Sequence, residues 1–367
     1  MKLHKNEKLK DLNVSEVVKI SVLHVILLSM TVIGLKSHVT ILPGILEFSK
    51  RDGWISVLIA LVLVMPWLYF VWRINKKESL PYTWKMSSSL YERVGIVVLI
   101  ILLYLLAAST LIEMLQWVKT TFMPVTPMLI LLVLYLILCV SFASLGIQTI
   151  VVVNVLVLFV VIVLGFFVAI VNIQYKDYSL LLPILENGWL PPLSASLLPL
   201  SGFMEILLFL LVSQYFKSPL QFKYYILIVM LLAGLTLGPL IGAIVEFGPE
   251  EASLKRYPAF EQWGLASLGD FIDHMDFFSI YQWMTGAFVR IGFYLFVVSK
   301  LMGIQQRTKE IWYYIAIPFA LVCLGMLLLD EQTFLIFNNI LLPYLTIGIL
   351  LLMPILLAVR SKKRASS

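Results

Sequence analysis

Long apolar runs separated by short polar segments constrain this chain more than any other feature of its sequence. Runs such as Val94–Val118 and Gly146–Val171 have the length that an α-helix needs to cross about 30 Å of hydrocarbon. The runs are continuous and do not alternate with polar residues, which favours helices over the strands of a β-barrel. The pattern therefore predicts an all-α polytopic membrane protein.

The composition agrees with this class and excludes two others. Of the 367 residues, 61% are hydrophobic and 13% are charged, whereas a soluble domain is about 45–50% apolar and about 25% charged. A soluble enzyme is therefore not expected, and a disordered chain would need low hydrophobicity and high charge. The net charge of +6 predicts no nucleic-acid partner, because the basic residues lie between the apolar runs, where they orient helices in a bilayer.

The apolar runs and the breaks between them predict ten transmembrane helices. A basic tail at 1–14 precedes them, and a second basic tail at 360–367 follows. Residues 15–359 form one ten-helix domain with two longer connections, at 172–192 and, in an acidic outer loop, at 246–275. The predicted helices are Ser15–Phe48, Trp54–Trp72, Val94–Val118, Pro124–Phe142, Gly146–Val171, Leu193–Phe216, Tyr224–Val245, Phe277–Ser299, Ile311–Leu329 and Phe334–Val359.

The distribution of basic residues supports this count and gives an orientation. With the N-terminus in the cytoplasm, 19 of the 27 Lys and Arg residues lie in segments predicted inside and 6 in segments predicted outside. The remaining two, Lys36 and Arg290, lie in the interior of predicted helices, whereas Lys19, which is counted inside, lies near the start of the first helix. The positive-inside rule requires such a bias, so both termini are predicted to be cytoplasmic.

Two of the predicted helices are interrupted at corresponding places in the two halves of the chain. The middle of the first carries a glycine, polar side chains and a proline (Gly34, Lys36, Ser37, His38 and Pro43). The sixth has a similar set (Pro199, Ser201, Gly202 and Glu205). Such breaks are typical of inverted-repeat transporters of the LeuT type, whose substrate lies near the bilayer midplane. We therefore predict a 5+5 inverted repeat, about 15–171 and 193–359, with broken helices 1 and 6.

Charged residues within the hydrocarbon are costly and usually mark function. The candidates are Lys36, Glu113, Glu205 and Arg290. One interpretation is a ligand site, in which Lys36 faces a carboxylate and Glu205 an ammonium or hydroxyl group. The alternative is structural, because Lys36 and Glu205 would also pair with each other, and Arg290 would equally suit an internal ion pair. Glu113 is expected nearer the outer surface.

The remaining candidates are uncharged. Thr285 offers a hydroxyl in the eighth helix, although helix packing by small residues explains this position equally well. Tyr104 and Ala108 of the third helix are predicted to line the same cavity. The acidic cluster Asp270, Asp273, His274 and Asp276 is interpreted as part of a solvated outer loop and not as a metal site. No catalytic or phosphate-binding motif occurs in the sequence, so neither an enzyme nor a cofactor is predicted.

Several short motifs stand out in the sequence. They are EFGPE at 246–250, RYP at 256–258, GDFIDHMD at 269–276, WMTG at 283–286, LP at 42–43 and DGWIS at 52–56. Together they resemble the B subunit of the GerA-type germinant receptors of spore-forming Firmicutes, a family within the amino acid/polyamine/organocation superfamily. The resemblance covers essentially the whole chain and is most specific in the outer loop.

The resemblance implies a location, partners and a ligand region. Such B subunits lie in the spore inner membrane beside an A subunit and a C lipoprotein, and they bind a small nutrient to start germination. The ligand region of the family would correspond to the break in the first helix, to the sixth helix and to Thr285. One difference stands out, because many members carry Gly-x-Gly shortly before Leu-Pro, where this chain has Lys36 and His38.

Two functions are compatible with this sequence. The first is a nutrient sensor, for which amino acids, nucleosides and sugars all remain open as ligands. The second is a secondary transporter of amino acids or related small solutes, which would share the same fold. The two differ in flux, because a sensor needs only to change conformation when its ligand binds.

Overall fold

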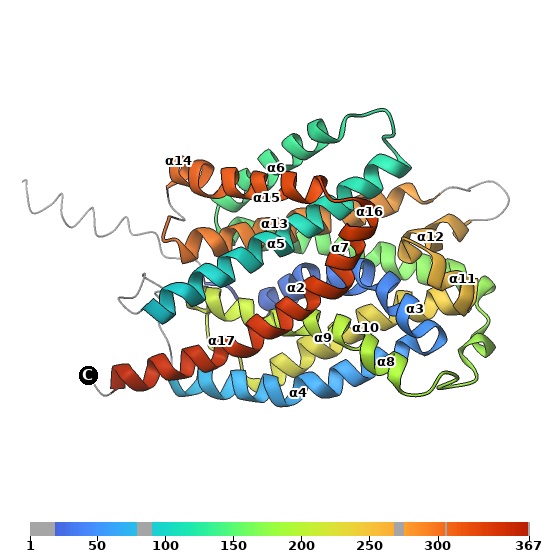
Figure 1. Ribbon diagram of the computed structural model, residues 1–367, viewed down its shortest axis with the longest axis horizontal. Helices are drawn as coiled ribbons and strands as arrows, with labels where there is room; N and C mark the ends of the chain where they lie inside the picture. Colours follow the sequence, from blue (N-terminus) through green and yellow to red (C-terminus); the bar gives the residue numbers. More distant parts are fainter. Residues whose placement is uncertain (1–18, 79–89, 268–274, 305–306, 366–367) are drawn as a thin grey trace, which may run out of the picture.

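The computed structural model describes residues 19–78, 90–267, 275–304 and 307–365. Within these ranges the chain is helical, and its only strand-like pairing is an isolated parallel bridge between Ile20 and Phe216. The long helices lie side by side along the longest axis, and the C-terminus is at one end of the bundle (Figure 1). The prediction of an all-α polytopic membrane protein is confirmed.

Seven α-helices are long, and shorter α, 3-10 and π segments (η) join or extend them. The long helices are α4 (Gly53–Glu78), α5 (Leu90–Thr121), α6 (Met128–Ser144), α7 (Ile147–Val171), α10 (Phe222–Phe247), α13 (Phe277–Leu301) and α17 (Leu342–Ala365). The shorter elements are α2 (Val22–Val32), η1 (Lys36–Thr40), α3 (Leu42–Ser49), η2 (Lys50–Asp52), η3 (Asn172–Tyr175), η4 (Tyr178–Leu181), α8 (Leu190–Ala195), α9 (Leu197–Met204), η5 (Glu205–Tyr215), α11 (Pro249–Leu254), α12 (Pro258–Leu265), α14 (Thr308–Ile311), η6 (Trp312–Ala316), α15 (Ile317–Leu327), α16 (Glu331–Ile336) and η7 (Phe337–Leu341).

Nine helical segments of the described chain are long and apolar enough to cross a membrane. The 17-residue α6 is a further apolar helix that is shorter than these. The prediction of ten spans in two inverted repeats is not settled by this count and stays a prediction. The outer-loop residues Asp270, Asp273 and His274 and the tail at 1–14 lie outside the described residues.

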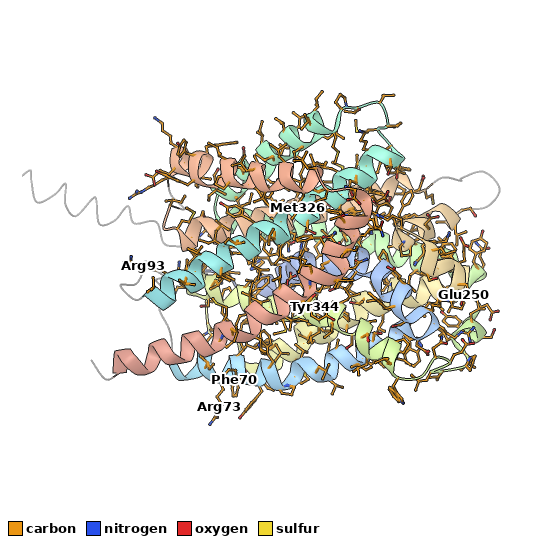
Figure 2. The ribbon with its side chains drawn as sticks, in the orientation of Figure 1. Phe70, Arg73, Arg93, Glu250, Met326 and Tyr344 are labelled. Atoms are coloured by element: carbon orange, nitrogen blue, oxygen red, sulfur yellow. The ribbon has the colours of Figure 1, made fainter. Side chains whose placement is uncertain are left out.

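The two ends of the bundle differ in structure. Arg73 and Arg93, both predicted to be cytoplasmic, lie at the end that holds the C-terminus, and Glu250 of the predicted outer loop lies at the opposite end (Figure 2). The short helices α3, α8, α11 and α12 also gather at that opposite end (Figure 1). Which end faces the cytoplasm stays a prediction.

The interruption of the first helix takes a different form from the one expected. The chain stays helical, and η1 is a π-helical turn in which the N–H of Ile41 bonds to the carbonyl of Lys36 at 3.1 Å. Pro43 follows three residues after the end of η1 and has no N–H to donate to Val39. A widened turn accommodates such a proline without unwinding the chain. The predicted break in the first helix is thus a change of winding and not an unwound segment.

The sixth predicted helix becomes narrower than an α-helix, whereas the first becomes wider. It begins as α8 and α9 and then continues as the 11-residue 3-10 segment η5, which begins at Glu205. Runs of 3-10 helix longer than three or four residues are uncommon, and a mid-helix stretch often marks a hinge or strain. The first interrupted helix thus contains a wide π-helical turn, and the sixth contains a narrow 3-10 segment. Neither contains a stretch of extended backbone.

Helix α13 lies in the centre of the bundle and packs against α5, α6 and α7. Its Gly292 faces Phe142 of α6, and a Cβ atom at this position would come within 2.5 Å of the ring. The ring has little room to move, because Phe142 also stacks on Phe288 at a centroid distance of 4.2 Å. A glycine is thus required where α13 packs against this ring.

We expect Gly292→Ala to lower the free energy of unfolding by about 1–3 kcal/mol through overpacking. The measurement is thermal unfolding of the full chain in lipid nanodiscs. Gly165→Ala in α7 is the matched control, because no atom lies within 4 Å of its Cβ position and alanine favours a helix over glycine. Equal melting temperatures for the two variants would contradict the packing described at Gly292.

Candidate functional site

Two of the predicted intramembrane charges meet in the centre of the bundle. The Nζ atom of Lys36 lies 3.0 Å from Oε1 of Glu205 and donates a second hydrogen bond of 2.9 Å to the hydroxyl of Ser201. The Glu205 side chain is fully buried and that of Lys36 is nearly so. Lys36 is the first residue of the π-helical turn η1, and Glu205 is the first of the 3-10 segment η5. Both charges therefore lie where the winding of a helix changes.

Arg290 of α13 is the third charged member of this cluster. Its Nη1 lies 2.9 Å from Oε2 of Glu205, and its Nη2 lies 3.3 Å from Oε1. The same guanidinium donates from Nε to the hydroxyl of Thr110 at 3.1 Å and from Nη1 to the carbonyl of Val32. Arg290 thus connects α13 with α2, α5 and η5 through a fork of fixed geometry.

Tyr294 completes the set of partners around the carboxylate. Its hydroxyl donates to Oε2 of Glu205, and the Arg290 guanidinium lies 4.8 Å from the centre of its ring. The two oxygens of Glu205 therefore accept four hydrogen bonds, two on each oxygen, which is about the full capacity of an ionised carboxylate. A ligand group can reach Glu205 only by replacing one of these donors.

Small residues allow the two interrupted helices to approach each other. A Cβ atom on Gly202 would lie 3.4 Å from the hydroxyl oxygen of Ser37. Ser201 and Glu205 are four residues apart and share a helix face, so both reach Lys36. We call Lys36, Ser201, Glu205, Arg290, Tyr294 and Thr110 the central network, and Ser37 and Gly202 lie beside it.

Other predicted site residues lie away from this network. The ring of His38 bonds to the carbonyl of Gly34 on its own helix, and the Cα of Gly34 faces Leu235 of α10. Thr285 bonds to the carbonyl of Tyr281 in its own helix. These hydrogen bonds are local to each helix, and a role of these positions in ligand binding stays a prediction.

The three candidates on α5, Tyr104, Ala108 and Glu113, have different neighbours. Tyr104 donates to the carbonyl of Tyr314 at 3.3 Å and packs against Phe319, so its partners lie on η6 and α15. Ala108 is fully buried. Glu113 is buried one helical turn beyond Thr110, near Arg290 but in no ion pair among the described residues. A shared cavity for Tyr104, Ala108 and the central network stays a prediction.

Sequence reasoning missed two members of the central network, Tyr294 and Thr110. Tyr294 lies four residues after Arg290 on the same helix face, and this spacing was the available signal. Thr110 precedes Glu113 by three residues on α5. Neither carries a charge, and tyrosine and threonine occur in transmembrane helices for many reasons, so the charge criterion did not select them.

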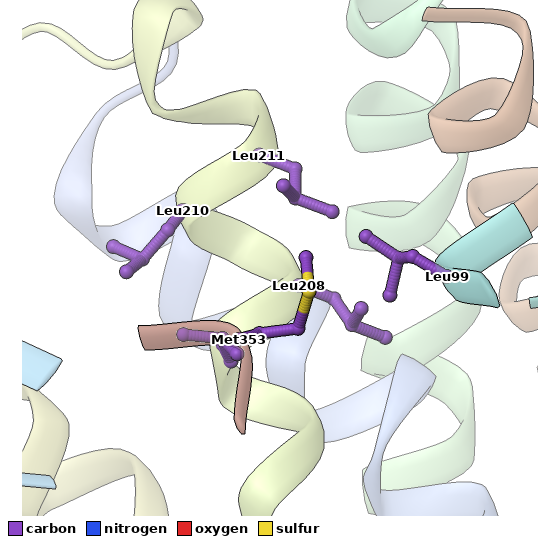
Figure 3. Close-up of a pocket in the computed structure, with 6 residues that line it drawn as sticks. Leu99, Leu208, Leu210, Leu211 and Met353 are labelled. Atoms are coloured by element: carbon purple, nitrogen blue, oxygen red, sulfur yellow. The ribbon is translucent and has the colours of Figure 1, made fainter. Parts of the chain in front are cut away.

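A small pocket lies beside the network and has a different character. It is lined by Leu99, Leu207, Leu208, Leu210, Leu211 and Met353, and its volume of about 10 Å³ is close to the space of one water molecule (Figure 3). No polar side chain lines it. The pocket therefore offers neither the room nor the hydrogen bonds that a polar molecule needs.

The fold and the central network define a class: a polytopic helical membrane protein with paired charges buried between two interrupted helices. Comparison with known proteins gives the family. A family model described as "Spore germination protein" matches residues 19–335. The chain therefore belongs to the spore germination protein family and is related to germination as a multi-pass membrane protein.

Two relatives extend over nearly the whole chain. The chain is similar to "Spore germination protein XB" of Bacillus anthracis, with 35% identity over 344 residues that cover 90% of this chain and 96% of the relative. It is also similar to "Putative spore germination protein YfkT" of Bacillus subtilis (strain 168), with 26% identity over 338 residues that cover 91% and 92% of the two chains. The resemblance to GerA-type B subunits seen in the motifs is confirmed.

Proposed function

We propose that this chain is the nutrient-sensing membrane subunit of a spore germination receptor and that a small polar nutrient binds at the central network. The observation that carries the proposal is the buried carboxylate of Glu205, shared by Lys36 and Arg290 between two interrupted helices. Burying three charges costs free energy that an apolar core would avoid. If the charges exchange partners with a ligand, their function explains why they are buried despite this cost.

The geometry favours Lys36 as the partner that a nutrient displaces. Lys36 makes two hydrogen bonds, one to Glu205 and one to Ser201. Arg290 makes four hydrogen bonds. Two of them go to Glu205, and the other two hold it to α5 and α2. An ammonium or hydroxyl group of the nutrient takes the place of Lys36 on Glu205, and the released Lys36 binds a carboxylate or hydroxyl group of the same molecule.

Such an exchange would also move the helices. Lys36 and Glu205 stand at the first residues of η1 and η5, so separating them alters the contact between the two interrupted helices. A ligand shifts a conformational equilibrium only as far as its affinity differs between the states. The state with Lys36 on Glu205 is the resting state, and nutrient binding favours a second arrangement of these helices.

The remaining parts of the proposal follow the family. The subunit lies in the spore inner membrane with both termini in the cytoplasm, and it acts beside an A subunit and a C lipoprotein. The end of the bundle with Arg73 and Arg93 faces the spore core, and the end with α11 and α12 faces outward.

We expect Lys36→Met to raise the nutrient concentration for half-maximal germination by about 10- to 100-fold, because charge-assisted hydrogen bonds contribute about 1.5–3 kcal/mol. Protein abundance should stay near the parent level, since Arg290 still pairs with Glu205. The measurement is a dose–response curve of dipicolinic acid release from spores over a panel of amino acids, nucleosides and sugars.

Lys50→Met is the matched control. Lys50 pairs with Glu250 at 2.6 Å, but both side chains are exposed, so its loss should leave the dose–response curve unchanged. A parental curve for Lys36→Met at normal abundance would refute nutrient binding at the central network. Uptake of the labelled nutrient into vesicles that contain this chain, with germination unaffected by its deletion, would indicate a secondary transporter.

A further inference from the structure

A second buried polar cluster lies on α5, outside the central network. Three of its side-chain atoms are buried without a hydrogen-bond partner: Oε2 of Glu113, Oε1 of Gln116 and Nε1 of Trp117. Gln116 and Trp117 follow Glu113 by three and four residues, so both lie next to it on the helix surface. Nearly all buried polar atoms in proteins have a partner, and the two acceptor oxygens of Glu113 and Gln116 require a specific explanation.

Glu113 is the most costly of the three, because a carboxylate buried without a cation loses its hydration uncompensated. Its side chain is 8% exposed, and the side chain of Thr40 on η1 is its hydrogen-bonding neighbour. The nearby cations are engaged elsewhere. Arg290 binds Glu205, and Arg256 of the outer loop binds Glu331 at 2.9 Å.

Aromatic rings enclose the same region. Trp117 stacks on Trp283 at 4.5 Å, Tyr257 meets Trp283 edge-on at 5.4 Å, and Phe260 of α12 meets Trp117 at 5.4 Å. Burial raises the pKa of the Tyr257 phenol above its usual value, so this ring carries no negative charge of its own. The faces of tryptophan and tyrosine rings attract cations, and more strongly where water is excluded.

We propose that Glu113 and Gln116 form a second binding site, which takes a small monovalent cationic group. The carboxylate and amide oxygens are its acceptors, and the rings of Trp117 and Tyr257 line it. The site lies near both the central network and the outer loop, because Arg290 and Arg256 are both close enough to Glu113 to interact with its charge. It is separate from the nutrient site proposed above and does not depend on it.

Two sources supply this chemistry, the ammonium group of a nutrient and a free monovalent metal ion. The test uses the full chain in lipid nanodiscs and follows its melting temperature at constant chloride concentration. Methylammonium chloride and potassium chloride are titrated against N-methyl-D-glucamine chloride, whose cation is too bulky for the site. We expect one of the two probes to raise the melting temperature saturably, by about 2 °C or more.

The rise should vanish in Glu113→Gln and persist in Glu250→Gln, which alters an exposed carboxylate at the same end of the molecule. Gln116→Leu keeps the carboxylate and should raise the half-saturating cation concentration severalfold. This variant provides the test if Glu113→Gln does not fold. A rise with methylammonium alone assigns an ammonium group, and a rise with potassium alone assigns a metal ion. No saturable rise, or one that survives in Glu113→Gln, overturns the proposal.

Discussion

Glu205→Gln is expected to lower the free energy of unfolding by about 3–5 kcal/mol, the usual effect of removing one partner of a buried ion pair. The variant keeps the size of the side chain but leaves Lys36 and Arg290 without their shared anion. Lys36 can lose its proton and become neutral, whereas an arginine in a protein keeps its charge. The uncompensated charge of Arg290 therefore dominates the loss.

Thermal unfolding in nanodiscs and the abundance of the protein in spore membranes measure this effect. Tyr294→Phe is the matched control, since it removes one hydrogen bond from the same carboxylate and keeps all three charges. It should lose about 1.5–3 kcal/mol. If Glu205→Gln were as stable as Tyr294→Phe, the carboxylate would not be the charge that holds Lys36 and Arg290 in the core.

The fold class followed from the sequence because the bilayer imposes a simple requirement. Every backbone polar group within hydrocarbon must find a partner, so long apolar runs can only become helices or strands of a barrel. Continuous runs such as Gly146–Val171 become α7 at nearly the same bounds. The short helices α11 and α12 were not predicted, because polar outer segments carry no comparable constraint.

The winding of the interrupted helices was beyond sequence reasoning. Gly34 and Pro43 in the first helix predict a disturbance, but an unwound segment and a π-helical turn satisfy the same residues. Tertiary packing decides between them, and here the chain stays hydrogen-bonded through η1. The 3-10 winding of η5 has no sequence signature at all, because leucine-rich runs fit α and 3-10 helices alike.

The central network was partly predictable because charge within hydrocarbon is rare. That rule selected Lys36, Glu205 and Arg290, and the structure joins all three. It also confirms the pairing of Lys36 with Glu205, which the sequence left open beside a ligand role.

Arg290→Lys is expected to abolish the nutrient response and to lower the free energy of unfolding by about 3 kcal/mol, although it conserves the charge. The guanidinium contacts Val32, Thr110 and both oxygens of Glu205 at once. A lysine ammonium has three donors at one point on a flexible stem. It can pair with Glu205 but cannot also hold α2 and α5.

The measurements are thermal unfolding in nanodiscs and nutrient-triggered release of dipicolinic acid from spores. Arg307→Lys is the matched control, because Arg307 pairs with Glu310 at an exposed position and its replacement should change stability by less than about 0.5 kcal/mol. A stable and responsive Arg290→Lys variant would show that Glu205 needs only a nearby positive charge. Arg290 would then not be the fixed member of the central network. Arg290 and Lys36 would not differ in role, because both cations would be replaceable at the same carboxylate.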